Sequence, residues 1–208
     1  MKLSIDLKDL HSWILPTILL LGFLLRLIYV ETPVLDWHAF RQADTASVTY
    51  RYVQEGIDPL VPRYHDLSNI QSGQPNPQGY RMVEFPLINI AQATVLRAVP
   101  ALPFTPTVRF FSIMASVGSI LLLYAVTKRI SGTRVALWSS LVFAVLPYSI
   151  FYGRAVLPEP FLVFFVLLSV WGFQRWLQLD PSWSDVKGWG WYLLSLAALS
   201  VAFLLKPF

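Results

Sequence analysis

Three long stretches of this 208-residue chain contain no charged residue, namely positions 110–127, 135–153 and 188–205. A helix needs about 20 apolar residues to cross the roughly 30 Å hydrocarbon core of a bilayer. Charged residues make up only 13% of the chain, whereas soluble domains carry roughly 25%. The pattern predicts an all-α, polytopic integral membrane protein. It argues against a soluble globule, a disordered segment and a nucleic-acid-binding module, and the absence of cysteine argues against a disulfide scaffold.

Five segments are long and apolar enough to be predicted as membrane spans. They are residues 12–30, 109–127, 134–152, 158–176 and 189–206. The first is too long for the apolar core of a signal peptide, and no small-residue cleavage site follows it. We therefore expect an uncleaved signal anchor followed by four further spans.

Basic residues predict the orientation of these spans. Three cations occupy the short loop 128–134, and Lys2 and Lys8 precede the first span. The positive-inside rule places both segments in the cytoplasm. Because two predicted spans already lie between them, the loop 31–108 is expected outside. Its apolar stretch 85–102 is then expected to lie along the outer interface, or to re-enter, rather than to cross.

Two interfacial helices are predicted within this outer loop. One runs over about 45–55, where Asp44 could cap its beginning and Gly56 could end it. The other runs over about 85–99, with Pro86 in its first turn, where the missing N–H is harmless. Five residues can share one face of the second helix: Leu87, Ile90, Ala91, Thr94 and Val95. Its polar residues would then lie on the other faces of the helix.

Acidic residues are concentrated in the outer loop. Seven of the twelve lie there: Glu31, Asp36, Asp44, Glu55, Asp58, Asp66 and Glu84. Counting the crossings also places the loop 153–159, which contains Glu159, at the outer face. Lys206 falls on the same face, and residues 179–188 fall inside. Solvation of an external loop explains any single acid. In a chain this poor in charge, however, the concentration predicts a functional site on that face.

Four short stretches hold the candidate charged residues there. The candidate site residues are Asp36, His38, Arg41 and Asp44 in 36–46, Glu84 in 80–87, Arg154 and Glu159 in 153–160, and Lys206 in 205–208. Structural roles are open for the same residues. The histidine could form interfacial hydrogen bonds, the glutamates could favour the positive ends of helices, and the basic residues could anchor or snorkel at the interface.

Four motifs of the chain, three of which overlap these stretches, resemble membrane glycosyltransferases that use a polyprenyl-phosphate sugar as donor. This group includes the protein O-mannosyltransferases and the lipid A aminoarabinose transferases (glycosyltransferase family 39, GT-C fold). The matching motifs, in order, are His38-Ala-Phe-Arg-Gln-Ala-Asp-Thr-Ala, Glu84-Phe-Pro-Leu, Val108-Arg-Phe before a span ending in Leu-Tyr-Ala-Val-Thr-Lys-Arg, and Tyr152-Gly-Arg-Ala-Val-Leu-Pro-Glu. The resemblance runs from about residue 20 to about 206. Because family members are usually more than twice this length, residues 1–208 are expected to be the N-terminal part of a single GT-C-type transmembrane domain.

In this family an acidic residue of the first outer loop acts as the catalytic base, and two residues here match it. The Asp-Glu-x-His pattern of the protein mannosyltransferases favours Asp36, although Trp37 stands where those proteins have glutamate. The Arg-Gln-Ala-Asp-Thr-Ala pattern of the bacterial members favours Asp44. We favour Asp44 and keep Asp36 as the alternative.

The implied reaction is displacement, with inversion, at the anomeric carbon of a sugar linked to undecaprenyl or dolichyl phosphate. Asp44 or Asp36 would remove the proton of the acceptor hydroxyl. Three cations would meet the charge on the lipid phosphate: Arg41, Arg154 and Lys206. Glu84 and Glu159 would orient the sugar or the acceptor, or would join His38 in holding a divalent metal ion.

The expected partners are the bilayer, a polyprenyl-phosphate-linked sugar and an acceptor that is protein, lipid A or another glycan, with no nucleic acid. The expected location is the bacterial plasma (inner) membrane, with a cytoplasmic N-terminus and an outer, periplasmic site. Two other classes stay open. A transporter fragment would need charges at mid-membrane, and Arg26 is the only ionisable residue well inside a predicted span. In a non-catalytic scaffold, joint replacement of Asp44, Glu84, Arg154 and Glu159 would leave function unchanged.

Overall fold

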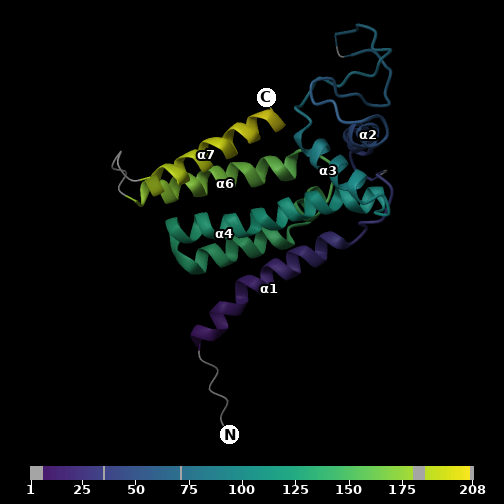
Figure 1. The fold of residues 1–208 in the computed structure, drawn as a ribbon. Helices are drawn as coiled ribbons and strands as arrows, with labels where there is room; N and C mark the ends of the chain where they lie inside the picture. The colour runs from purple at the N-terminus through teal and green to yellow at the C-terminus, as the bar shows by residue number, and fades with distance from the viewer. Residues whose placement is uncertain (1–6, 35, 71, 180–185, 207–208) are drawn as a thin grey trace.

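The computed structural model describes residues 7–34, 36–70, 72–179 and 186–206. Helices account for most of this part of the chain (Figure 1). They are α1 (Leu7–Leu27), α2 (Ala39–Glu55), α3 (Leu87–Ala98), α4 (Phe104–Val145), α5 (Pro147–Tyr152), α6 (Glu159–Leu177) and α7 (Val186–Leu205). Extended pairing among the described residues is limited to an isolated bridge between Arg63 and Tyr80. The predicted all-α class is confirmed.

The 42-residue helix α4 consists of two arms that fold against each other at Gly132. The backbone there has φ 82° and ψ 172°, a combination that is open essentially to glycine alone. Beyond this point the Ser140 hydroxyl donates to the Ile120 carbonyl oxygen at 3.4 Å. In a straight helix, 20 residues would separate these groups by about 30 Å. The arms 104–131 and 133–145 therefore run side by side, as Figure 1 shows.

Three helices in the described part of the chain are long and apolar enough to cross a membrane, where the sequence predicts five spans. They are Phe104–Val145, Glu159–Leu177 and Gly188–Leu205, and Trp13–Leu27 is a shorter apolar helix. One of the two missing spans is the first, whose apolar helix ends at Leu27 and is too short. The other has a local cause. Two of the predicted spans are joined within α4, and the second of them stops early because Leu146 is extended before Pro147, as residues preceding proline usually are.

Small residues allow the long helices to approach closely. A Cβ added to Gly172 of α6 would lie 3.2 Å from the Trp191 carbonyl oxygen of α7, and the Ser169 and Ser195 hydroxyls lie 3.2 Å apart. Such close approach through small residues is typical of helix association in lipid. Many large apolar side chains point outward instead, among them Leu20, Leu24, Phe110, Met114, Leu121, Val166, Phe173, Leu193 and Phe203. The outer surface of the bundle therefore suits contact with lipid tails.

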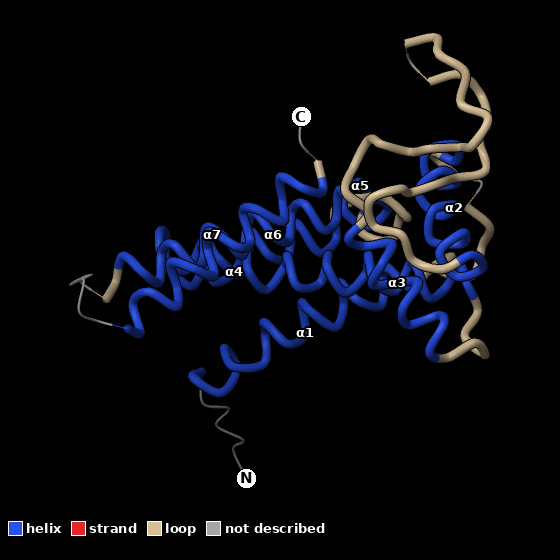
Figure 2. Tube along the Cα trace, turned by 45° about the horizontal axis from the view of Figure 1, so that its top comes forward, coloured by secondary structure: helices blue, strands red, loops and turns tan. Residues whose placement is uncertain are grey.

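Residues 28–34, 36–70, 72–103, 153–158 and 206 gather at one end of the bundle, which we call the polar end (Figure 2). The opposite end, which we call the turn end, contains Gly132 and the C-terminus of α6 (Figure 1). Hydrogen bonds join the segments of the polar end. The Phe85 amide donates to the Leu204 carbonyl oxygen at 3.0 Å, and the Val156 amide donates to the side-chain oxygen of Gln42 at 3.0 Å.

Helix α3 lies beside α2 and runs in the same direction, since Asn89 contacts Thr45 while Arg97 contacts Tyr52. Its polar side faces α2, and the Thr49 hydroxyl donates to the buried Gln92 side-chain oxygen at 2.8 Å. Three residues of the predicted apolar face point outward: Ala91, Thr94 and Val95. With 12 residues, or about 18 Å, α3 is too short to cross a bilayer.

Candidate functional site

Asp44 lies on the second turn of α2 and does not cap that helix. The helix begins at Ala39, six residues before the predicted start, so the expected capping role of Asp44 is wrong. His38 occupies the capping position in a left-handed conformation, with φ 59°, and its side chain makes no capping hydrogen bond. Because of this earlier start, Arg41 and Asp44 are both helical and lie one turn apart. Side chains with that spacing share one face of a helix.

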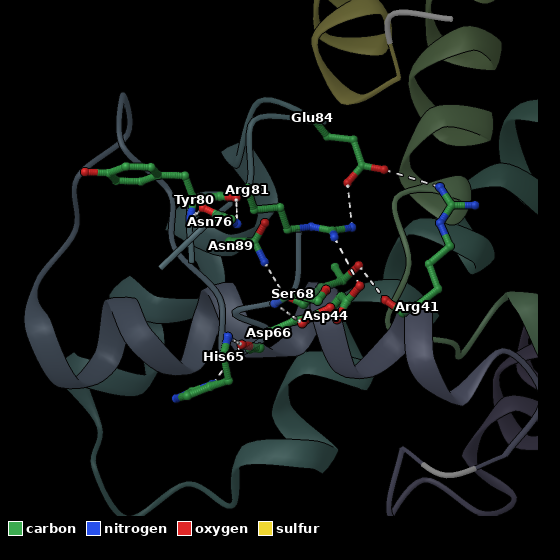
Figure 3. Close-up of polar contacts among 12 residues, drawn as sticks. Arg41, Asp44, His65, Asp66, Ser68, Asn76, Tyr80, Arg81, Glu84 and Asn89 are labelled. Carbon is green, nitrogen blue, oxygen red and sulfur yellow. Dashed lines mark hydrogen bonds and ion pairs between the residues drawn. The ribbon is translucent and has the colours of Figure 1, made fainter. Parts of the chain in front are cut away.

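Arg81 joins Asp44 to Glu84 (Figure 3). Its Nη1 atom lies 3.3 Å from Asp44 Oδ2, and its Nη2 atom lies 3.8 Å from Glu84 Oε2. All three side chains are largely buried, with exposures of 11% for Arg81, 15% for Asp44 and 13% for Glu84. Arg81 lies in the stretch 80–87, which contains the predicted site residue Glu84. However, its own role could not be foreseen, because its partner Asp44 is distant in the chain.

Arg41 extends this network to the other side of the polar end. Its Nη2 atom lies 3.3 Å from Glu84 Oε1, and its Nη1 atom lies 3.1 Å from Glu159 Oε1. Lys206, at the end of α7, lies 3.1 Å from the same Glu159 oxygen. Acids and bases thus alternate through six side chains, which we call the ionic row: Asp44, Arg81, Glu84, Arg41, Glu159 and Lys206. The row connects α2, the loop before α3, and the ends of α6 and α7.

The electrostatics of the ionic row differ from residue to residue. Burial raises the pKa of Asp44 and Asp66 raises it further, while the charge of Arg81 acts in the opposite direction. Glu159 has one carboxylate oxygen, Oε2, that is buried and that no donor of the described residues reaches. A buried acceptor without a donor is uncommon in folded proteins. This oxygen is therefore suited to accept a hydrogen bond from a bound hydroxyl.

Asp36 lies in a second cluster. Its carboxylate is 3.6 Å from Arg109 Nη2 and 3.4 Å from Arg154 Nη1, and it accepts a 2.6 Å hydrogen bond from the Gln42 amide. Gln42 also accepts from the Val156 amide. The cluster ties the segment after α1 to α4 and to the turn before α6.

Arg109 and Arg154 are the cations of this cluster. Arg109 is fully buried and donates to the Tyr29 carbonyl oxygen and, at 2.9 Å, to the Thr32 hydroxyl. The Arg154 guanidinium also lies over the rings of Tyr29 and Phe151, 5.7 Å and 5.3 Å from their centres. The structure therefore places Arg154 beside Asp36, apart from Arg41 and Lys206. Arg109 was missed as a site residue, because the sequence marks it only as the first residue of a span and as part of the Val108-Arg-Phe motif.

His38 lies among aromatic side chains. Its ring centre is 6.0 Å from that of Trp37 and 5.9 Å from that of Tyr152. Glu84 and Glu159 instead share Arg41, a cation, between them. No group of three or more His, Asp or Glu side chains suited to a metal ion occurs in the part of the chain that the structure describes. The predicted set of His38, Glu84 and Glu159 is therefore not assembled as a metal site.

Arg26, which the sequence places inside a span, is fully buried at the polar end of α1. Its guanidinium donates to the carbonyl oxygens of Gly22, Phe143, Ala144 and Ser149 and to the hydroxyls of Ser116 and Ser149. Two of those carbonyls belong to the last turn of α4, where the break before Pro147 leaves them without helical partners. Arg26 thus fastens the α4–α5 junction and does not line a path through the bundle.

A small cavity of about 20 Å³ lies beside the ionic row, bordered by Glu84, Asn89, Gln92 and apolar residues of the 156–161 segment. It is large enough for about one water molecule. The Asn89 amide, on its wall, donates to the Thr45 carbonyl oxygen and to the Thr49 hydroxyl, each at 2.8 Å. The floor of the site is thereby fixed by hydrogen bonds between α2 and α3.

Comparison with known proteins gives one match. A family model described as dolichyl-phosphate-mannose-protein mannosyltransferase matches residues 82–208. The matched region contains Glu84, Arg154, Glu159 and Lys206, and it begins after Asp36 and the whole of α2. No curated protein and no solved structure matches the chain.

Proposed function

The chain belongs to the dolichyl-phosphate-mannose-protein mannosyltransferase family, and from this premise we propose that its polar end transfers a sugar from a polyprenyl-phosphate donor to an acceptor hydroxyl. Family membership and the apolar helices make the chain an integral membrane protein of a glycosyltransferase family. The donor, the acceptor, the side of the membrane and the residues that act form the proposal.

The proposed step is a single displacement. A carboxylate removes the proton of the acceptor hydroxyl while that oxygen attacks the anomeric carbon. The bond between this carbon and the phosphate oxygen breaks, and the polyprenyl phosphate leaves with the electron pair. The configuration at the anomeric carbon is inverted. The site must therefore supply one base and, on the other side of the sugar, positive charge for the leaving phosphate.

The observation that carries the proposal is the bridging position of Arg41. It holds Glu84 at 3.3 Å and Glu159 at 3.1 Å, beside the ends of two membrane-crossing helices. A planar guanidinium between two carboxylates can exchange one of them for phosphate, because the two groups present similar pairs of oxygens. Lys206, beside Glu159, adds a second cation. A lipid phosphate at the helix ends would meet both.

We assign the base to Asp44, with Asp36 as the alternative. Burial raises the pKa of Asp44, and a carboxylate with a raised pKa is a stronger base. Asp36 instead faces Arg109, Arg154 and the Gln42 amide. Those contacts occupy both of its oxygens and suit a structural role. Arg154 would then act on the phosphate only if it left Asp36.

Glu159 and Glu84 are proposed to orient the substrates. The free Oε2 atom of Glu159 would accept a hydrogen bond from a hydroxyl of the sugar or of the acceptor. Glu84, which touches both Arg41 and Arg81, would hold the two guanidiniums in position. The acceptor is a hydroxyl of a protein, of lipid A or of another glycan, and the description of the matched family favours protein.

The site is proposed to face the outer, periplasmic side of a bacterial plasma membrane. The cations Lys128, Arg129 and Arg134 flank Gly132 at the turn end, and the positive-inside rule assigns that end to the cytoplasm. Because the ionic row lies at the polar end, it would then face outward, where lipid-linked sugars are available without nucleotide donors. The N-terminus would be cytoplasmic.

The test measures mannose transfer from a polyprenyl-phosphate mannose donor in membranes that contain the protein. Asp44→Asn should abolish transfer while the amount of protein in the membrane is unchanged. Glu55→Gln is the matched control, since Glu55 is an acid of the same helix that pairs with Arg51 on an exposed face, and it should keep wild-type transfer. Full transfer by Asp44→Asn would remove Asp44 as the base. Loss of transfer in folded Asp36→Asn alone would reassign the role to Asp36.

A further inference from the structure

An apolar groove lies at the turn end, between α1 and the second arm of α4. It encloses about 490 Å³ and is lined by Ile14, Ile18, Thr133, Arg134, Leu137, Trp138 and Leu141. This volume lies within the roughly 300–1,000 Å³ of small-molecule binding sites. Trp138 on its rim is 63% exposed. The groove is therefore open from the side that a membrane-crossing bundle turns toward lipid.

The polar groups of the groove are confined to one of its ends. Thr133 and Arg134 directly follow Gly132, and both are exposed. No ion pair joins Arg134 to a carboxylate among the residues that the structure places. The remaining lining residues are apolar. One charged end and one apolar trough match the two parts of a lipid, its headgroup and its acyl chain.

The charge that α4 contributes around Gly132 is positive. Lys128 and Arg129 lie one helical turn before Gly132 and are exposed, and the sequence has no acidic residue between Glu84 and Glu159. A cluster of three cations at the membrane surface attracts anionic headgroups, and basic pockets between membrane helices on the cytoplasmic side are known to bind anionic lipids. A zwitterionic lipid would gain less from this surface.

The groove is separate from the ionic row. Arg109, which contacts Asp36 at the polar end, lies in the arm of α4 that ends at the break at Gly132, so more than 20 residues, or about 35 Å, separate the two ends. The groove therefore cannot hold the reacting groups of a sugar donor bound at the polar end.

We propose that this groove binds an anionic phospholipid, with the phosphate at Arg134 and the Thr133 hydroxyl and an acyl chain along Ile14, Ile18 and Leu141. The guanidinium donates to the phosphate oxygens. The acyl chain fills the trough between α1 and the second arm of α4, and the lipid thereby supports the fold-back at Gly132. The site does not depend on the proposed transfer reaction.

The test is native mass spectrometry of the purified protein, titrated with phosphatidylglycerol or with phosphatidylcholine of the same acyl chains. Wild-type protein should retain phosphatidylglycerol in preference to phosphatidylcholine. Arg134→Gln should reduce that preference at least about fivefold, the value of one cation at a membrane surface. Arg134→Lys should keep most of it. Ile18→Trp, which fills the trough, should reduce retention of both lipids.

Arg175→Gln is the matched control. Arg175 lies near the C-terminus of α6 at the same end of the bundle, and it contacts the rings of Trp171 and Trp191, away from the groove. This variant should retain the lipid preference. The proposal is overturned if Arg175→Gln loses the preference as strongly as Arg134→Gln does, or if Arg134→Gln keeps it with unchanged helix content by circular dichroism. Displacement of phosphatidylglycerol by glycerol phosphate alone would show that the site recognises only the phosphate, and it would overturn the proposal of a lipid site.

Discussion

Arg41 Nη1 lies 3.1 Å from Glu159 Oε1, so a residue of the loop helix α2 is held against the first turn of the membrane helix α6. Within the ionic row, this contact joins the residues of α2 and of the loop before α3 to those at the ends of the membrane helices. It also fixes the distance between Asp44, one turn further along α2, and Lys206, the cation at the end of α7. If the site transfers sugar as proposed, the contact sets the spacing between base and phosphate.

Replacing Arg41 should therefore affect transfer strongly. We expect Arg41→Gln to reduce mannose transfer by about 10²–10³, the usual effect of removing one donor to developing negative charge. Arg41→Lys should recover only part of the activity, because an ammonium cannot bridge two carboxylates as a guanidinium does. Arg51→Gln, which breaks an exposed pair on the same helix, is the control and should transfer normally. Equal activity in Arg41→Gln and Arg51→Gln would argue against a role for the bridge.

Asp36 and Asp44 should differ in their effect on stability. Asp36→Asn removes the charge partner of the fully buried Arg109, and we expect a loss of about 1–3 kcal/mol in the free energy of unfolding. Asp44→Asn should cost much less. Because the pKa of Asp44 is raised in the folded protein, its ionised form already opposes folding, and this effect grows as the pH rises through that pKa. Thermal unfolding in detergent at neutral pH measures both variants, and a larger loss in Asp44→Asn would contradict the assignment.

The pH dependence of transfer should follow the environment of Asp44. A base must be ionised, so the rate should fall as the pH drops through its pKa, at a pH above the ordinary aspartate value of 3.8. Two neighbours act on this pKa in opposite directions. Arg81→Gln should move the acid limb of the rate profile to higher pH, because Arg81 lowers the pKa, and Asp66→Asn should move it to lower pH. Shifts of the same sign in both variants would show that another group titrates.

Gly132 should tolerate no side chain without loss of stability. A Cβ would meet nothing within 4 Å, so Gly132→Ala tests backbone strain alone. We expect a cost of about 1–3 kcal/mol from φ 82° and ψ 172°. Gly190→Ala, in helix α7 and equally free of nearby atoms, should be neutral or stabilising, as is usual for glycine to alanine in a helix. Thermal unfolding compares the two variants, and an unchanged midpoint in Gly132→Ala would mean that the arms of α4 need no glycine.

Single cysteines can test the orientation without background, because the chain has none of its own. Ser72, in the loop between α2 and α3, and Ser131, at the turn end, are both exposed. Ser72→Cys should react with an impermeant maleimide added to intact spheroplasts, and Ser131→Cys should react only after the membrane is permeabilised. The reverse pattern would place the ionic row on the cytoplasmic side.

Much of the site could be expected from the sequence because of where its charges lie. Glu84, Glu159 and Lys206 border the apolar runs, and a charged residue next to a membrane helix is confined to that end of it. The pairing of these residues could not be read in the same way. Arg81 and Arg109 were passed over because their partners, Asp44 and Asp36, are far away in the chain.

The sequence by itself determined the all-α membrane class, since the free-energy cost of placing a charge in lipid acts on each segment separately. Its ordered motifs determined the family resemblance. Only the tertiary structure decided that Asp44 lies within a helix instead of capping it, that Arg154 pairs with Asp36, and that α4 folds back at Gly132. These features depend on which segments pack together. Packing of that kind is fixed by distant contacts and by a few backbone angles, and a local pattern of residues carries neither.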